Sequence, residues 1–450
     1  MRKSVINFLL SFVIAIVITL LLKEPGFTDS QTYVIFLLFF SIGLWATEAI
    51  PAFAVSLFII AYLVFALGNP HINSAPENIE QYAQTFSDHI IWLLLGGFFL
   101  AKAMAKTKLD QSLITTTLKI AGTNPRNILI ALMAVTMLSS MLISNTATTS
   151  MVLAAVMPLI LSLGKNSNVA KAIVLGIPVA STAGGMATII GTPANAITAG
   201  VLRNAGIEID FLGWIIYGLP LALVLTIICC IALIIKYLKN TDPVSINSLI
   251  EEKSDDIKTS LLYRRIVIVV IIITVGLWLT SSIHGLTAAS VCAVPLVVFT
   301  LTGVLNGKDI QGMGWDTLFL VAGGLSLGLA LENTGLLNHY AQMLSNLQLN
   351  STFLLYLFGF MAMLLATVMT NSTTSTLMVP ICMSILVAFK LEVALIVALS
   401  SSTALLLLAS SPSNAIIYGT GFIQQKDLRL TGLLFGLIGP LITILWVTFN

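Results

Sequence analysis

Two clusters of hydroxyl and amide side chains interrupt otherwise apolar stretches of this sequence. The first occupies residues 144–150 and contains Asn145, and the second occupies residues 370–376 and contains Asn371. Ser, Thr and Asn commonly cap helix N-termini, where unpaired N–H groups and partial positive charge favour an anion. Their oxygens, together with carbonyls of unwound backbone, also suit a hard cation such as Na⁺. The two clusters therefore predict sites for an anion and a cation.

A proline interrupts the apolar stretch that follows each cluster. The sequence is TPANAI at residues 192–197 and SPSNAI at residues 411–416. A proline removes one backbone hydrogen bond and frees the carbonyl group four residues earlier. Irregular backbone at membrane depth is tolerated only where it is buried in protein or lines a wet cavity. The paired breaks therefore favour a binding site over ordinary helix packing.

These motifs contain no Lys or Arg, and we expect none near them at membrane depth. An anion there would have to be held by neutral donors, helix ends and a co-bound cation. Because an unpaired dianion in a medium of low dielectric constant is costly, we expect coupling to an ion.

The composition indicates that lipid surrounds most of the chain. Hydrophobic residues make up 57% of it and charged residues 9%, against about 25% charged in a soluble domain. The net charge of +2 argues against a nucleic-acid partner. Since a span needs about 20 apolar residues, we predict an all-α polytopic membrane protein with spans at 5–22, 32–49, 52–68, 89–104, 212–238, 264–283, 286–304, 316–333 and 431–449. Interrupted apolar stretches lie at 127–163, 169–202, 351–388 and 392–423.

A polar segment at 239–263 divides the chain into two halves that repeat. Asn145 lies 49 residues after Gly96, and Asn371 lies 48 residues after Gly323. With the N-terminus in the cytoplasm and the C-terminus outside, all but three of the 21 basic residues fall on the cytoplasmic side, as the positive-inside rule requires. The first hairpin then opens from inside and the second from outside. The sequence therefore predicts inverted repeats in a cell membrane, with interrupted segments that mark a transporter's binding site.

The motifs resemble those of the divalent-anion/sodium symporter family. The resemblance extends over nearly the whole chain and includes TEAIP at 47–51, SNT at 144–146, GTP at 191–193 with Asn195, and the equivalents in the second half. It implies a homodimer with a scaffold and a mobile transport domain that moves as an elevator. The second half reads TNS and SPSN where the family usually has SNT and TPPN.

The resemblance also implies roles by position. The expected substrate-binding residues are Ser144, Asn145, Thr146, Thr192, Pro193, Thr370, Asn371, Ser372, Ser411 and Pro412. The expected sodium ligands are Ser140, Ser144, Asn145 and Gly191 in the first half and Thr367, Asn371 and Ser410 in the second.

The same resemblance divides the chain into domains. The expected scaffold comprises residues 1–126 and 264–345, joined to the rest by a cytoplasmic linker at 241–263. The expected transport domain comprises residues 127–240, with an inner hairpin at 127–163 and a broken helix at 169–202. Residues 346–450 complete it, with an outer hairpin at 351–388 and a broken helix at 392–423.

The leading functional hypothesis is sodium-coupled symport of small divalent anions such as the C4 dicarboxylates succinate, malate and fumarate. The alternatives on the same fold are an anion exchanger and a sulfate transporter. An intramembrane enzyme would need a Ser/His pair, paired Asp or HExxH at depth, and a channel would need a continuous polar pore. Both are remote alternatives, so we expect no enzyme and no organic cofactor.

The two predicted sodium sites differ. Ser140 stands four residues before the first motif serine, whereas Ala366, which has no side-chain oxygen, stands four residues before Thr370. We therefore expect the first site to bind Na⁺ more tightly, and the second to be weak, shifted onto Thr367, or absent.

Overall fold

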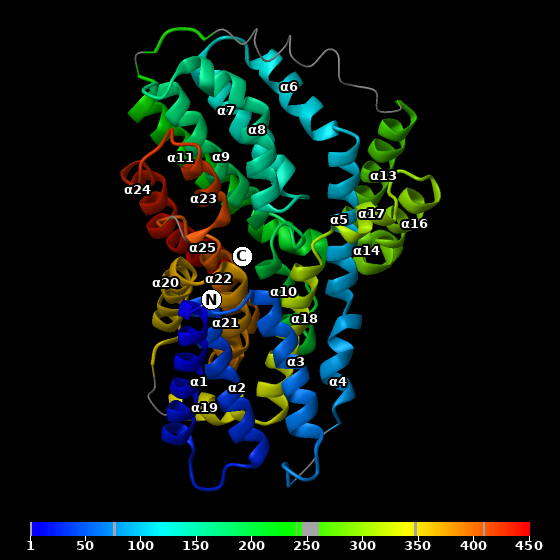
Figure 1. Ribbon diagram of the computed structural model, residues 1–450, viewed down its shortest axis with the longest axis vertical. Coiled ribbons are helices and arrows are strands. Elements are labelled where there is room, and N and C mark those ends of the chain that lie inside the picture. Colours follow the sequence, from blue (N-terminus) through cyan, green and yellow to red (C-terminus); the bar gives the residue numbers. More distant parts are fainter. Residues whose placement is uncertain (1, 75–77, 240, 245–260, 346–348, 408–409) are drawn as a thin grey trace.

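The computed structural model describes residues 2–74, 78–239, 241–244, 261–345, 349–407 and 410–450 (Figure 1). Most of the predicted linker at 241–263 therefore lies outside the described residues. Within the described part, ten helices are long and apolar enough to cross a membrane, or up to 11 if a pair bent by 118° between Ile385 and Val387 counts as one span. The chain is an all-helical polytopic membrane protein, as predicted.

The first half contains the helices that surround the first cluster and its proline break. They are α1 (Arg2–Leu22), α2 (Asp29–Thr47), α3 (Ala52–Gly68), α4 (Glu80–Ala83), η1 (Gln84–Ser87), α5 (His89–Lys106), α6 (Leu109–Ala121), α7 (Pro125–Ser140), α8 (Asn145–Leu163), α9 (Asn168–Met186), α10 (Pro193–Asn204) and α11 (Phe211–Tyr237). The predicted inner hairpin thus becomes α7 and α8, and the predicted broken helix becomes α9 and α10.

The second half follows the same plan. Its helices are α13 (Leu261–Leu279), α14 (Ser281–His284), α15 (Ala288–Val291), α16 (Ala293–Leu301), α17 (Gly307–Gln311), α18 (Trp315–Asn333), α19 (Leu336–Ser345), α20 (Ser351–Val368), α21 (Asn371–Ile385), η2 (Val387–Phe389), α22 (Lys390–Ser401), α23 (Pro412–Gly419), α24 (Gln425–Leu433), the π-helical η4 (Leu434–Ile438) and α25 (Gly439–Phe449).

The two halves pack their helices in matching ways. Helices α7 and α8 both pack on α9, and in the second half α20 and α21 both pack on α22. The halves also exchange contacts, because α10 packs on α21 while α23 packs on α8. Figure 1 shows α7 and α8 in the upper part of the molecule and α20 and α21 below them. Each proline break is therefore bordered by a hairpin from the other half.

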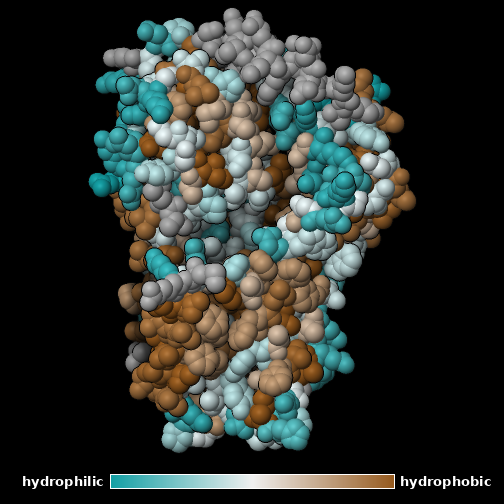
Figure 2. All heavy atoms as spheres, viewed as in Figure 1, coloured by the Kyte–Doolittle hydropathy of each residue, from teal (hydrophilic) through white to brown (hydrophobic). Residues whose placement is uncertain are grey.

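Glycines allow the closest helix contacts in both halves. A Cβ atom at Gly96 would collide with Cys292, which precedes α16, and one at Gly323 would collide with Ser56 on α3. Large apolar side chains instead face outward on α1, where Leu20 and Leu21 are 68% and 78% exposed. Figure 2 shows hydrophobic residues over much of the lower half of one face and a hollow near its middle. Apolar outer surface of this kind fits contact with lipid.

Candidate functional site

The two polar clusters cap the second helix of each hairpin. The Ser144 hydroxyl accepts a hydrogen bond from the Ala147 N–H at 3.4 Å at the start of α8. The Thr370 hydroxyl accepts one from the Thr373 N–H at 3.2 Å at the start of α21. Asn145 and Asn371 are consequently the first residues of these two helices. The capping role that the sequence predicts for these clusters is confirmed.

The proline breaks end in two further capped helices. The Thr192 hydroxyl accepts a hydrogen bond from the Ala194 N–H at 3.1 Å at the start of α10. The Ser411 hydroxyl accepts one from the Ser413 N–H at 3.2 Å at the start of α23. In both cases proline is the first helical residue, where its missing N–H costs no intrahelical hydrogen bond. Four helix N-termini thus begin at the predicted motifs. At α23 the N–H groups of Ser413 and Asn414 are both bonded to Ser411.

Asn195 and Asn414 form hydrogen bonds to backbone carbonyls within the two breaks. The Asn195 side-chain amide donates to the carbonyls of Gly185 and Thr188 at 2.9 and 2.8 Å. The Asn414 amide donates to the carbonyls of Leu405 and Leu407, both at 3.0 Å. Both asparagines are almost fully buried, so these bonds satisfy carbonyls that the helix breaks leave without helical partners. The sequence analysis quoted both residues but missed this role, which the shared Pro-x-Asn spacing could have indicated.

In the first half, three of the four predicted sodium ligands, Ser140, Asn145 and Gly191, lie close together. The Ser140 hydroxyl lies 2.9 Å from the side-chain oxygen of Asn145 and donates a hydrogen bond to it. Gly185 lies against that oxygen so closely that a Cβ atom would collide with it, and Gly191 approaches the backbone of Gly185. Ser140, Asn145 and Gly191 therefore border one small region of backbone and side-chain oxygens.

The first break is also tied to the hairpin turn. The Thr188 hydroxyl donates to the Met141 carbonyl, and the Gly191 N–H donates to the Thr188 hydroxyl at 3.1 Å. Deeper in the helices, the Thr149 and Ser181 hydroxyls lie 2.8 Å apart. These contacts make the hairpin and the broken helix of the first half one connected unit.

The second half is connected differently. Asn371 donates from its amide to the Ser402 hydroxyl at 3.4 Å, and its oxygen accepts the Ser372 N–H at 2.8 Å. The Thr367 hydroxyl instead donates to the Met363 carbonyl at 2.9 Å, and the Ser410 hydroxyl to the Leu407 carbonyl at 2.7 Å. Among the described residues no hydrogen bond joins Asn371 to Thr367 or Ser410, so the second predicted sodium set is not assembled by direct contacts.

The predicted residues differ in exposure. Ser144, Thr370 and Pro412 are exposed, and Asn145, Thr146, Pro193, Asn371 and Ser411 are half-buried. Ser140, Gly191, Thr192, Thr367, Ser372 and Ser410 are buried. The helix caps of the two hairpins are therefore the members of the set that solvent can reach most easily.

A cavity of about 270 Å³ reaches Ser144. One wall is formed by Ser144, Ala147 and Met151 at the start of α8, and another by Lys102 on α5. The sequence analysis expected no basic residue near the motifs at membrane depth, and its topology placed Lys102 on the cytoplasmic side. The packing of α5 nevertheless brings Lys102 to the cavity that contains Ser144.

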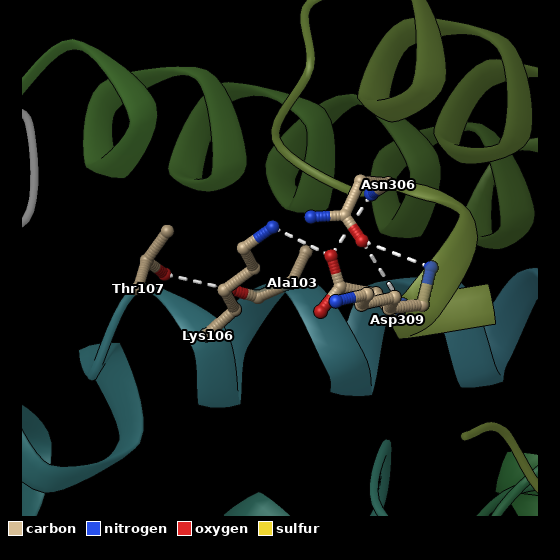
Figure 3. A network of polar contacts seen from close by, with 6 residues as sticks. Ala103, Lys106, Thr107, Asn306 and Asp309 are labelled. Carbon is tan, nitrogen blue, oxygen red and sulfur yellow. Dashed lines mark hydrogen bonds and ion pairs between the residues drawn. The ribbon is translucent and has the colours of Figure 1, made fainter. Parts of the chain in front are cut away.

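An ion pair fixes the end of α5 beside this cavity. The Lys106 ammonium contacts the Asp309 carboxylate, which also accepts the Asn306 N–H at 2.9 Å (Figure 3). Burial raises the pKa of Asp309, but the hydrogen bonds from Lys106 and Asn306 and the charges of Lys106 and Lys102 outweigh it, so the pKa lies below its usual value. This carboxylate is therefore ionised at neutral pH and holds α17 against α5.

Paired, capped helix breaks in a polytopic helical protein are typical of secondary transporters. The chain is a member of the citrate transporter family (CitMHS), whose family model matches residues 42–404 and again 277–449. Membership in a transporter family confirms that the chain is not an enzyme.

Relatives with assigned functions are similar over most of the chain. SdcS of Staphylococcus saprophyticus, named a sodium-dependent dicarboxylate transporter, is 28% identical over 473 aligned positions, which cover 96% of this chain and 89% of that protein. PHO87 of Saccharomyces cerevisiae, named an inorganic phosphate transporter, is 30% identical over 351 positions, which cover 75% of this chain and 37% of that protein. The match to SdcS confirms the resemblance to divalent-anion/sodium symporters.

A solved transporter structure shares the fold. The structure of MtrF from Neisseria gonorrhoeae, described among a class of antimetabolite efflux pumps, superimposes with a TM-score of 0.59 at 11% sequence identity. The superposition covers 90% of this chain and 96% of MtrF.

Proposed function

We propose that this protein is a sodium-coupled symporter of small divalent anions, with C4 dicarboxylates such as succinate, malate and fumarate as its substrates. The observation that carries the proposal is the contact of Ser140 with Asn145 at the capped start of α8. There, side-chain oxygens suited to Na⁺ lie beside a helix N-terminus suited to an anion. A sodium ion bound beside the dianion would offset part of its charge.

The substrate would lie between the two hairpins. Its carboxylates would contact Ser144, Asn145 and Thr146 from one half and Thr370, Asn371 and Ser372 from the other. Thr192-Pro193 and Ser411-Pro412 would contribute the N-termini of α10 and α23. The exchanged packing of α10 on α21 and α23 on α8 supports this arrangement, because each hairpin borders the break of the other half.

The protein would work as an elevator built from two inverted repeats. Residues 127–240 and 346–450 would form the mobile transport domain, and residues 1–126 and 264–345 the scaffold of a homodimer. The matched packing of the two halves supports the repeats. The charge bias of the loops supports a cytoplasmic N-terminus and an external C-terminus in a cell membrane.

Exchange is the second candidate, and one observation favours it. At the position that corresponds to Ser140, Ala366 offers no hydroxyl to a second sodium site. If the second half binds no Na⁺, the coupling that drives net uptake is weaker. Obligatory exchange of one dianion for another then becomes the more plausible cycle.

Uptake by purified protein in proteoliposomes tests both candidates. Radiolabelled succinate should accumulate under an inward Na⁺ gradient and should not accumulate under an equal K⁺ gradient. Unlabelled citrate, sulfate and phosphate, added in turn, would rank the anions. Uptake that needs internal succinate but not Na⁺ would replace the symporter with the exchanger, and binding of no tested dianion would overturn the proposal.

A further inference from the structure

The cavity beside Ser144 lies between two parts of the molecule that the proposed mechanism moves against each other. Ser144 and Ala147 belong to the proposed transport domain. The opposite wall consists of α5, with Phe98 and Lys102, and of the segment 312–314 that leads into α18. Both of these elements belong to the proposed scaffold. The cavity is therefore a passage that transport-domain movement would open or close.

Lys102 and Asp110 are the two charged residues among those that line this cavity. Asp110 is 4% exposed, and its carboxylate accepts the Gln111 N–H at 2.7 Å. Lys102 is half-buried, and within the described part of the chain its ammonium group makes no hydrogen bond or ion pair. The nearby Asp309 carboxylate is in contact with Lys106 rather than with Lys102.

Lys102 thus has no direct contact that cancels its positive charge, although the charge acts at longer range on Asp309, whose pKa it helps to lower. Burying part of a lysine ammonium without a carboxylate partner is costly, and an anion that enters the cavity would remove that cost. A charged cleft with walls of low dielectric constant also concentrates ions of opposite charge and raises their rate of entry. Both effects are larger for a dianion than for a monoanion.

The second half has no such charge at the matching position. Lys102 stands six residues after Gly96, and Leu329 stands six residues after Gly323. At that position the cavity beside α18 is lined by the apolar residues Leu325 and Leu329. Its lysine, Lys390, comes from α22 of the proposed transport domain and not from the proposed scaffold, and Glu332 lines the same cavity. Of these two matching scaffold positions, only that of the first half therefore carries a lysine that can attract an anion.

We propose that Lys102 recruits the dianion into the cavity beside Ser144 and so selects for doubly charged substrate on the side of the membrane where this cavity opens. The inference rests on the proposed function. Lys102 acts here as a specificity-determining residue of the access path, and the binding residues proposed above are unchanged. On the topology proposed above, this side is the cytoplasmic one.

Two-sided kinetics in proteoliposomes of defined orientation test this role. Lys102→Met should raise the half-saturating succinate concentration on the cavity side by about tenfold and leave the value on the opposite side unchanged. The difference between wild type and variant should shrink as ionic strength rises, because salt screens the lysine charge. Lys102→Arg should retain most of the wild-type affinity.

Competition measures the selection by charge. Monomethyl succinate, which carries one negative charge, should compete less well than succinate in the wild type, and the gap should narrow in Lys102→Met. Lys119→Met provides the matched control, since Lys119 is an exposed lysine on α6 and does not line the cavity. It should behave as wild type in every assay. If Lys102→Met fails to fold, Lys102→Gln takes its place in the same assays.

The outcomes separate the two proposals. If wild-type protein transports no dianion, the proposed function fails before Lys102 is considered. If the wild type transports succinate while Lys102→Met has unchanged affinity on both sides, the role of Lys102 is overturned. An equal loss on both sides would also overturn it, because it would indicate a part in the shared site.

Discussion

The Ser140 hydroxyl lies 2.9 Å from the side-chain oxygen of Asn145, and the corresponding position of the second half, Ala366, is a buried residue without a hydroxyl. We expect Ser140→Ala to weaken apparent Na⁺ affinity by roughly tenfold, which corresponds to about 1.4 kcal/mol for one lost oxygen contact. Ala366→Thr should leave Na⁺ affinity unchanged or improve it. Initial rates of succinate uptake over a range of Na⁺ concentrations measure both effects. Normal Na⁺ affinity in Ser140→Ala would contradict the assignment.

Asn145 and Asn371 should each be essential for transport. Each is the first residue of a hairpin helix, where its amide can serve an ion and an anion together. We expect Asn145→Ala and Asn371→Ala to abolish succinate uptake while the purified proteins keep the wild-type elution profile and melting temperature. Near wild-type uptake by a folded Asn145→Ala protein would show that the site lies elsewhere.

The two hairpin tips should be accessible from opposite sides of the membrane. Ser144 and Thr370 are exposed helix caps, whereas Ser372, in the same cluster as Thr370, is 5% exposed and would be a poor probe. We expect Ser144→Cys and Thr370→Cys to react with membrane-impermeant maleimide from opposite sides, at rates that substrate changes. A background without the four native cysteines, Cys229, Cys230, Cys292 and Cys382, removes competing labelling. Labelling of both positions from one side in every condition would exclude inverted repeats.

Asn195 should contribute to stability as well as to transport. Replacing it with alanine leaves the Gly185 and Thr188 carbonyls without the bonds described above, at a cost of about 1–3 kcal/mol. We expect Asn195→Ala to lower the melting temperature of the detergent-solubilised protein and to reduce uptake. Asn168→Ala, which changes an exposed asparagine at the start of α9, is the matched control and should change neither. Equal melting temperatures for the two variants would disprove the role.

The Lys106–Asp309 pair predicts a dependence of stability on pH. Because the folded-state pKa of Asp309 is lowered, its contribution is present above the unfolded-state pKa and is lost as pH falls through the folded value. Asp309→Asn should therefore melt at a lower temperature than wild type at pH 7, and the difference should close below about pH 4. A difference in melting temperature that stays constant from pH 7 to below about pH 4 would show that the charge of Asp309 is not involved.

The sequence was sufficient to predict the elements whose ends carry a strong local signal. The predicted span 52–68 matches α3 at both ends, because Pro51 precedes the helix and Gly68 ends it. The caps at Ser144, Thr192, Thr370 and Ser411 were predictable for a similar reason, since a hydroxyl before Asn or Pro favours a helix start.

Features that depend on distant packing were not predictable. Residues 403–407 form the apolar sequence TALLL, yet they lie outside helix between α22 and α23, where Asn414 bonds to Leu405 and Leu407. In the sequence, nothing distinguishes Lys102 from any other basic residue near the end of a span. Its place in a cavity with Ser144 follows only from how α5, α8 and the segment before α18 pack together.

The asparagine bonds across both breaks have a consequence for the thermodynamics of the empty carrier. Since Asn195 and Asn414 already bond to the carbonyls at each break, the helices are unwound before any ligand arrives. The entropy of fixing these segments is lost once, during folding, and not again at each turnover. A ligand's interaction energy is then available for affinity and for discrimination between anions. In the proposed elevator cycle, the transport domain would move without ligand in the same local conformation of the breaks as with ligand.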